Sequence, residues 1–222
     1  MKSARKVIRQ NLLAKATRAR VADTLNRIVI PRFVEGPIKD SWKLLAPLER
    51  LNPATSIVRP IYFWFTALAE PLAYDFCTEY LAALRADGVR FVNVNDASAW
   101  IARMGNNWSA SVVIKVTRAL LAALRDFGIL EGKAHKYIAP PRLPVRPFAF
   151  IAFCLHRNGV PAREMATHPD WKIFLLAPDD VERSFFEAHQ EGLLEYYAAG
   201  SVVRLTFPAS TAEEYAHVVV GR

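Results

Sequence analysis

The sequence predicts a mainly α-helical protein, with a helical N-terminal bundle followed by winged-helix-like units that carry short β-hairpins. Apolar residues recur at helical spacing through most of the segment from 17 to 127. Two short β-type runs, 129–138 and 193–207, each follow a helical segment and enclose a glycine. No internal repeat, low-complexity tract or Gly/Ser-rich linker is visible in the 222 residues.

Four helices are predicted before residue 91. Thr17 is a suitable cap for the first, and Pro31 is expected to end or kink it. A second covers 40–51, a third starts at Asn52-Pro53, and a fourth covers 71–86 with Gly88 beyond its end. Residues 1–90 are therefore interpreted as a basic helical N-terminal region.

Residues 91–140 are predicted to form a winged-helix-like unit. Asn95 and Asp96 are expected to cap a short helix that ends at Met104. Ser109 or Ser111 then opens a longer helix to 127, which a glycine closes, and a hairpin with a basic tip follows. The apolar spacing places these residues of the longer helix in the core: Val112, Val116, Leu120, Leu121 and Leu124. Trp108 is also expected in the core.

Residues 141–222 are predicted to form a C-terminal helix and hairpin unit, which is acidic. The proline-rich stretch 140–147 is the expected joint, because prolines keep the chain extended and stiff. Helices are expected at 148–157 and from Asp179 or Asp180 to 190. A hairpin over 193–207 and a short helix or edge element over 211–220 follow.

Charge is distributed unevenly along the chain. Residues 1–32 carry nine basic side chains and one acidic, a net +8, whereas residues 33–178 carry about +5 and residues 179–222 carry −5. This asymmetry indicates a polyanionic partner for the front of the chain, either nucleic acid or an anionic membrane. A charged, solvated helix surface is the alternative interpretation.

No catalytic, cofactor or metal motif is recognisable. The nucleotide-binding glycine loops, HExxH and GxSxG are missing, and the five histidines do not have the spacing of a zinc site. Asp170 and Lys172 form part of a nuclease pattern, but the required second carboxylate strand is not evident, so a turn with an exposed lysine is expected. The sequence therefore predicts no enzyme activity, no cofactor, no metal and no small-molecule substrate.

The chain is expected in the cytoplasm. The most apolar stretch, 57–69, is broken by Arg59 and Pro60 and is shorter than the about 20 residues that a membrane span requires. The N-terminus lacks the apolar region of a secretory signal. Cys77 and Cys154 form no CxxC pair and are predicted to be buried free thiols, although a single disulfide stays open.

Double-stranded DNA is the expected partner, held mainly through its phosphates. One group of candidate residues lies at the basic front: Arg5, Lys6, Arg9, Lys15, Arg18, Arg20 and Arg27. A second group lies on the long helix and the hairpin of the winged-helix-like unit: Asn107, Ser109, Ser111, Lys115, Arg118, Lys133 and Lys136. For the second group, a solvated helix cap and hairpin tip is the alternative.

Several short segments resemble the BrxA family of bacteriophage-exclusion (BREX) defence systems. In the front half they are Asn11-Leu12-Leu13, the Thr17-Arg18 helix start and the end from Ile28 to Arg32. In the middle they are Trp108-Ser109, Leu120-Leu121 and 124–130, and near the end 174–176, Val181, Phe185, Gly192-Leu193 and 200–205. In one respect we expect the sequence to depart from the family, because an additional N-terminal helix that the resemblance implies is not recognisable in it.

The resemblance implies a small, cytoplasmic, largely helical protein that binds double-stranded DNA. Such a protein works beside the methyltransferase, ATPase and phosphatase-like members of its system, and other BREX proteins are possible partners. No catalytic residues accompany the family. Two alternatives remain open at this point: an adaptor that docks a defence protein through its acidic C-terminal unit, and an RNA-binding helical protein.

Overall fold

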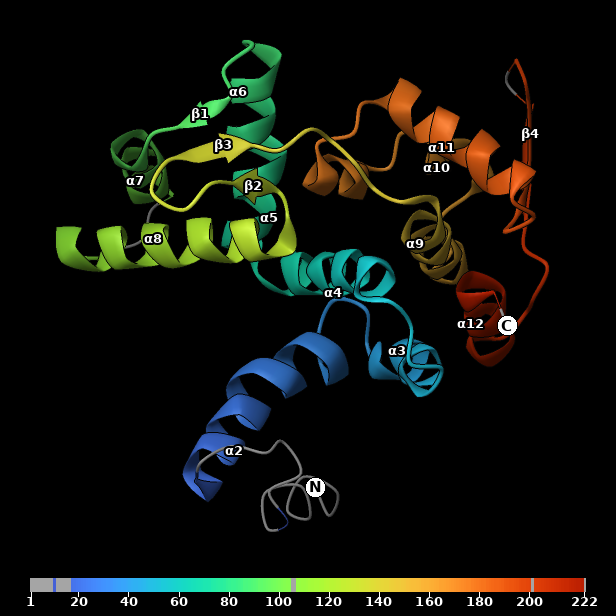
Figure 1. The fold of residues 1–222 in the computed structure, drawn as a ribbon, viewed down its shortest axis with the longest axis horizontal. Coiled ribbons are helices and arrows are strands. Elements are labelled where there is room, and N and C mark those ends of the chain that lie inside the picture. The colour runs from blue at the N-terminus through green and yellow to red at the C-terminus, as the bar shows by residue number, and fades with distance from the viewer. Residues whose placement is uncertain (1–9, 11–16, 105–106, 201, 222) are drawn as a thin grey trace.

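The computed structural model describes residues 10, 17–104, 107–200 and 202–221. The fold is mainly α-helical with two small antiparallel sheets, as predicted from the sequence. Helix α4 (Thr55–Ala69) lies in the middle of the molecule, with α2 (Arg18–Thr24) and α3 (Trp42–Arg50) below it in Figure 1. Because its apolar residues occur on several sides, α4 packs against elements from every part of the fold.

The first helix does not end at Pro31, so that alternative of the prediction was wrong, and the kink stays a prediction. Helix α2 begins after Thr17, whose hydroxyl accepts the N–H of Arg20 at 3.2 Å, and continues into the π-helix η1 (Leu25–Val34). In a π-helix each N–H reaches five residues back, as Glu35 does to the carbonyl of Ile30 at 2.9 Å. The wider turn accommodates a proline, which has no N–H to donate.

Residues 71–138 form what we call the first hairpin unit. One helical run of α5 (Pro71–Asp75), the π-helix η2 (Phe76–Leu81) and α6 (Ala82–Ala86) leads to strand β1 (Phe91–Val92). Helices α7 (Val94–Arg103) and α8 (Ala110–Phe127) follow, and then strands β2 (Leu130–Glu131) and β3 (Lys136–Ile138). The sheet order is β1-β3-β2, with both pairs antiparallel.

Two details of this unit differ from the sequence prediction. Strand β1 was not predicted, because two residues are too short for a periodic signal. The cap of α7 is Asn93, whose side chain accepts the N–H of Asn95 at 2.8 Å, so the helix begins two residues earlier than the predicted caps Asn95 and Asp96. The long helix and the hairpin lie where they were predicted.

Residues 145–206 form the second hairpin unit. It contains α9 (Val145–Arg157), α10 (Ala162–Met165), the 3-10 helix η3 (Pro169–Phe174), α11 (Pro178–Gln190) and the hairpin of β4 (Glu195–Ala199) and β5 (Val202–Thr206). Helix α12 (Ala212–Val220) then returns to pack against α3 and α9. Thr211 and Glu214 form a capping box at its start.

One continuous core connects these parts. Buried residues of α3, α8 and α9, such as Leu48, Leu124 and Phe153, belong to the same apolar cluster. The predicted division at residues 90 and 140 stays a prediction, since a shared core neither requires nor excludes it.

The two cysteines are buried free thiols, as predicted. Cys77 lies on η2 and Cys154 on α9, and neither forms a disulfide. Burial disfavours the thiolate, which raises the pKa of Cys77 to about 12 and that of Cys154 further in the same direction.

Asp170 of the nuclease-like pattern is a buried structural carboxylate. It accepts hydrogen bonds from Trp64 Nε1 at 2.8 Å and from the Tyr74 hydroxyl at 3.1 Å. Lys172 is exposed, as expected, although it lies in the 3-10 helix η3 and not in a turn. Among the described residues, no helix is both long and apolar enough to cross a bilayer.

Candidate nucleic-acid interface

Helix α8 is held in a fixed orientation by its buried face. Val113, Thr117, Leu121 and Leu124 are buried, and Gly128 ends the helix in the left-handed conformation at φ 85°. Thr117 donates a hydrogen bond to the carbonyl of Val113 at 2.8 Å and accepts one from Ser98 of α7 at 3.1 Å. This polar link inside the contact fixes α8 against α7.

The buried face is rotated from the predicted one. Val112 is exposed, although its apolar character placed it in the predicted core, and Trp108 is exposed as well, against the same expectation. The stretch from Val112 to Val116 is apolar at four of five positions, so its spacing did not fix which side faces inward. Thr117 occupies the inward position because its hydroxyl is satisfied there.

Three candidate residues share the outer side of α8. Ser111, Lys115 and Arg118 follow one another at four- and three-residue intervals, and all are exposed. In the described part of the chain, neither Lys115 nor Arg118 forms an ion pair. The first acidic residue along the helix is Asp126, which pairs with Arg125 at 2.6 Å near the other end. Every charged side chain in the first half of α8 is therefore positive.

The start of α8 adds partial positive charge to this side. Ser109 occupies the cap position, but its hydroxyl interacts with that of Ser111 at 3.1 Å instead of capping the backbone. The first turn contains no acidic residue, so no carboxylate on it offsets the partial positive charge of the helix start. Asn107 is exposed just before it, and Asn106 lies outside the described residues.

The β2–β3 loop contributes one of its two candidate lysines. Lys133 is exposed and, among the described residues, has no acidic partner. Lys136 is buried instead of lying at the hairpin tip, and its ammonium group donates to the carbonyl of Lys133. Lys136 therefore supports the shape of the loop rather than presenting its charge to solvent.

Helix α2 supplies a second cationic position. Arg18 and Arg20 are exposed in its first turn, where no acidic residue offsets the positive end of the helix. Arg27 forms an exposed ion pair with Asp23 at 2.7 Å, so part of its charge is already neutralised. Four candidates of the basic front lie outside the described residues: Arg5, Lys6, Arg9 and Lys15.

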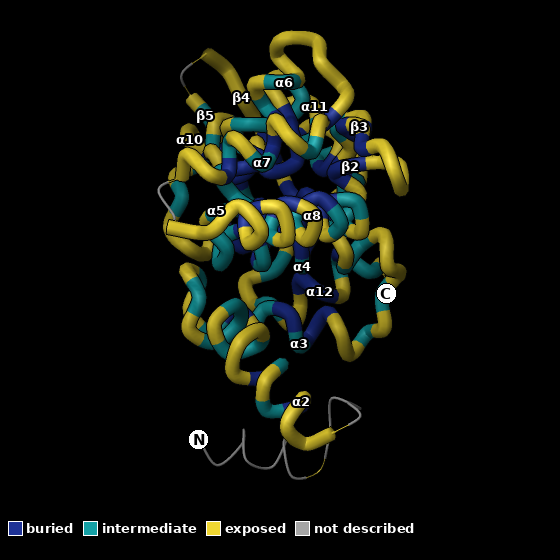
Figure 2. The backbone as a smooth tube through the Cα atoms, turned by 90° about the vertical axis from the view of Figure 1, so that its left-hand side faces the viewer, coloured by how far each residue is buried: buried dark blue, intermediate teal, exposed yellow. Residues whose placement is uncertain are grey.

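Figure 2 shows how these segments are arranged. Helix α8 lies in the middle of the face toward the viewer, and α2 lies below it, toward the lower end of the described chain. The structure therefore groups Ser111, Lys115 and Arg118 on one helix and places Arg18 and Arg20 on a separate one.

Sequence reasoning missed three further cations around the first hairpin unit. Arg85, Arg90 and Arg103 are exposed and, in the part of the chain that the structure describes, take no part in ion pairs. They lie at the ends of α6 and α7 and just before β1. Without β1, nothing in the sequence indicated that Arg90 lies beside the hairpin.

A family model for BrxA matches residues 2–153, which include the whole of the first hairpin unit. The chain belongs to the BrxA family. Membership supports a role associated with BREX phage exclusion, with other BREX components as partners. Comparisons with curated proteins and with solved structures found no match. The matched region ends within α9, so the similarity noted over 174–205 lies outside it.

Proposed function

We propose that this BrxA-family protein is a non-enzymatic, double-stranded DNA-binding component of a BREX system, and that the first hairpin unit is a winged helix. The observation that carries the proposal is the order helix, β1, α7, α8, β2, β3 with the sheet order β1-β3-β2. In winged-helix and related helix-turn-helix proteins, the second helix of such a pair enters the major groove. Here that helix is α8, which carries exposed cations.

The geometry of α8 suits backbone-dominated binding. The major groove is about 12 Å wide and admits an α-helix. With α8 in the groove, Lys115 and Arg118 are expected to contact phosphates of the DNA backbone. Lys133 on the β2–β3 loop is expected to contact a phosphate beside the groove. Val112 and Ile114 are also exposed, and apolar side chains of that kind contact thymine methyl groups.

Salt dependence follows from the number of phosphate contacts. If Lys115, Arg118, Lys133, Arg18 and Arg20 each neutralise one phosphate, the logarithm of the binding constant falls against the logarithm of salt with a slope of about −4.5. Contacts made by the residues from 1 to 16 would steepen this slope.

The proposed absence of catalysis rests on how the nuclease-like residues are used. Both carboxylate oxygens of Asp170 accept hydrogen bonds from aromatic side chains, which leaves this group committed to the fold. We place the protein in the cytoplasm, a reducing compartment in which the two free thiols stay reduced.

The decisive test is charge reversal on α8. The double variant Lys115→Glu/Arg118→Glu is expected to weaken binding to a duplex of 20 to 30 base pairs about thirtyfold, because two charge-assisted contacts become repulsive. The measurement is fluorescence anisotropy across a salt series. Arg204→Glu on β5 is the matched control, since Arg204 is exposed and removed from α8. Equal losses for both variants would show that α8 is not the binding helix.

A second function, that of an adaptor, is favoured by one feature of the second hairpin unit. An apolar groove of about 620 Å³ lies between α11 and the β4–β5 hairpin, and Phe186, Tyr197 and Val202 line it with large exposed surfaces. Co-purification with other BREX proteins that is lost in Phe186→Ser/Tyr197→Ser, together with no salt-dependent duplex binding, would favour the adaptor. A preference for duplex RNA would favour an RNA-binding protein.

A further inference from the structure

The outer side of the β1-β3-β2 sheet carries a pair of exposed aromatic rings. Phe91 and Tyr137 are partners in register on β1 and β3, so their side chains lie on the same face of the sheet. Their ring centroids are 5.6 Å apart, and 42% of Phe91 and 46% of Tyr137 is exposed to solvent. The alternate residues Val92 and Ile138 are buried on the opposite face.

A third ring extends this pair. The imidazole of His135 lies 6.1 Å from the ring of Phe91, at the end of the β2–β3 loop. Within the described chain, no other element packs over these three side chains closely enough to bury them. Exposing two large aromatic rings side by side is unfavourable in water, and such patches mark binding surfaces.

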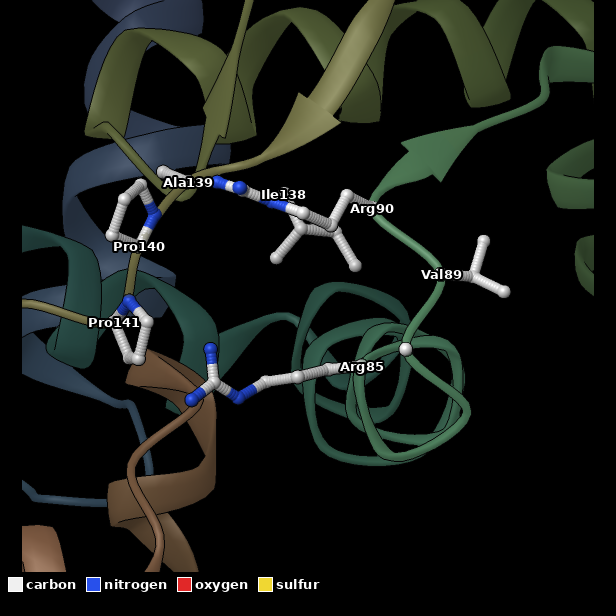
Figure 3. Close-up of a pocket in the computed structure, with 8 residues that line it drawn as sticks. Arg85, Val89, Arg90, Ile138, Ala139, Pro140 and Pro141 are labelled. Atoms are coloured by element: carbon white, nitrogen blue, oxygen red, sulfur yellow. The ribbon is translucent and has the colours of Figure 1, made fainter.

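Cations border the same sheet. Lys133 is exposed on the loop, and Arg90 directly precedes Phe91. Figure 3 shows Arg85 and Arg90 reaching from α6 and from the segment before β1 over one hollow. The hollow measures about 460 Å³, and Pro140 and Pro141 form part of its wall.

The charge around the rings is positive overall but not uniform. Glu131 on β2 is in register with Tyr137 on β3 and is exposed, so one carboxylate lies beside the aromatic pair. Asp87 lies between Arg85 and Arg90 in the sequence. Over the segments 85–93 and 129–142, five basic side chains face two acidic ones.

Paired DNA does not account for these rings. In a duplex each base is stacked between its neighbours, so an aromatic side chain on a sheet has no free base face to contact. An unpaired base has two such faces, and proteins that hold single strands combine aromatic platforms with a cationic path for the phosphates. The combination of neighbouring exposed rings and nearby guanidinium groups fits that chemistry.

We propose that this sheet binds single-stranded DNA, with bases stacked on Phe91 and Tyr137 of its outer face. The DNA strand then passes the β1 edge of the sheet, and a phosphate is held in the hollow between Arg85 and Arg90, which Ile138 of the opposite face helps to line. This activity goes beyond duplex binding by α8 and uses different residues. Together the two surfaces let one hairpin unit hold duplex DNA and an adjoining unpaired strand.

The test uses oligo(dT) of about 12 nucleotides and the full-length chain. Phe91→Leu/Tyr137→Leu keeps the apolar character but removes the aromatic faces, and we expect about a tenfold loss of oligo(dT) affinity with duplex affinity unchanged. The matched control is Phe186→Leu/Tyr197→Leu, because these aromatic residues are exposed to a similar extent, 44% and 53%, on the acidic second unit. The control should bind oligo(dT) like the wild type.

The arginine hollow is tested separately. Arg85→Ala/Arg90→Ala should lower oligo(dT) affinity and reduce the salt slope by about 0.7 for each phosphate that these arginines no longer bind. An unchanged slope would remove the hollow from the site. The Lys115→Glu/Arg118→Glu variant should retain oligo(dT) binding, so failure of the duplex proposal and failure of this one are distinguishable.

Three outcomes would overturn the proposal. Equal oligo(dT) affinity in the Phe91→Leu/Tyr137→Leu variant and the wild type would exclude stacking on these rings. A change of oligomeric state in that variant, by size exclusion with light scattering, together with unchanged oligo(dT) affinity, would make the sheet a contact between copies of the chain. Tighter binding of oligo(U) than of oligo(dT) would assign the surface to RNA.

Discussion

The two hairpin units follow a similar order of elements but carry opposite charge. In the first, α7 and α8 precede the β2–β3 hairpin, and in the second, α10, η3 and α11 precede the β4–β5 hairpin. Helix α8 presents Lys115 and Arg118 on its outer side, whereas the beginning of α11 carries Asp179, Asp180 and Glu182. The same kind of scaffold therefore supports surfaces that suit different partners, which is why fold alone does not assign function.

The two units also differ in the number of strands in their sheets. The first has the strand β1, which pairs with β3 and widens the sheet to three strands, whereas the second keeps a two-stranded hairpin. Both expose aromatic residues, but in the first they stand beside the exposed pair Arg85 and Arg90. The two units therefore differ in surface charge more than in the order of their elements, and variants of each unit can test which of the two properties determines binding.

The largest expected effect concerns the thiols, one in each unit. Because burial raises the pKa of Cys77 to about 12 and that of Cys154 also upward, the thiolate fraction at pH 8 should fall about a thousandfold below that of an exposed cysteine. Alkylation of the native protein should therefore be very slow and should become fast in denaturant. Rapid labelling of only one thiol would show that its unit opens more readily than the other.

The raised thiol pKa values also predict how the stability of the folded state depends on pH. The folded state holds each proton more tightly than the unfolded chain, so this contribution to stability is complete below about pH 8.5 and is lost as the pH rises toward 12. Denaturant unfolding of Cys77→Ala at pH 7.5 and at pH 10 is the measurement. The variant should be less sensitive to this pH change than the wild type.

A smaller effect is expected at Asp170, which connects the second unit to α4 and to the first unit. Asp170 belongs to η3 of the second unit and accepts hydrogen bonds from Trp64 on α4 and Tyr74 on α5. Asp170→Leu leaves both donors without an acceptor and should cost about 2–5 kcal/mol, or roughly 5–15 °C in Tm.

Asp170→Asn is the control for that variant, because it keeps one strong acceptor oxygen and should lose less stability. Thermal unfolding and duplex binding are measured on the same samples. If Asp170→Leu unfolds like the wild type, the carboxylate does not stabilise the packing of the second unit against α4 and α5.

Charge reversal on the second unit should have a modest effect on duplex affinity. Glu182→Lys/Glu187→Lys places cations on α11, where both positions are exposed, and should raise duplex affinity about fivefold at low salt through long-range attraction. The gain should vanish at high salt, where charges are screened within a few ångströms. Glu182→Gln/Glu187→Gln should give a smaller gain, and a gain that persists at high salt would indicate that α11 contacts DNA directly.

The smallest expected effect distinguishes paired from unpaired arginines on the N-terminal helix. Arg27 already pairs with Asp23 at the surface, so Arg27→Ala should change stability by less than about 0.5 kcal/mol and duplex affinity by less than about twofold. Arg20→Ala removes a cation that has no acidic partner among the described residues and should weaken binding more. Equal losses would mean that the Arg27–Asp23 pair opens to contact phosphate.

Much of the fold was predictable because it depends on local signals. Gly128 at a positive φ ends α8 as predicted, and Thr211 caps the last helix. The errors fall where distant parts of the chain decide the outcome. Val112 is exposed because α7 packs against the neighbouring side of α8, and β1 forms only because β3 is beside it. Lys136 is buried because its loop folds back on itself.

The candidate site was predictable in part. The sequence indicated Lys115, Arg118 and Lys133 as exposed cations, and the structure places each of them at the surface without an acidic partner in the described chain. Arg85 and Arg90 were missed because their relation to the hairpin depends on a strand of two residues.

By itself, the sequence determined the helical class, the places of the hairpins and the uneven distribution of charge, because propensity, turn residues and net charge act over a few neighbouring positions. Tertiary structure decided which side of α8 meets solvent, which lysine of the loop stays available and that Phe91 stands beside Tyr137. These outcomes require residues from separate segments to compete for the same buried space, and no local pattern contains that competition.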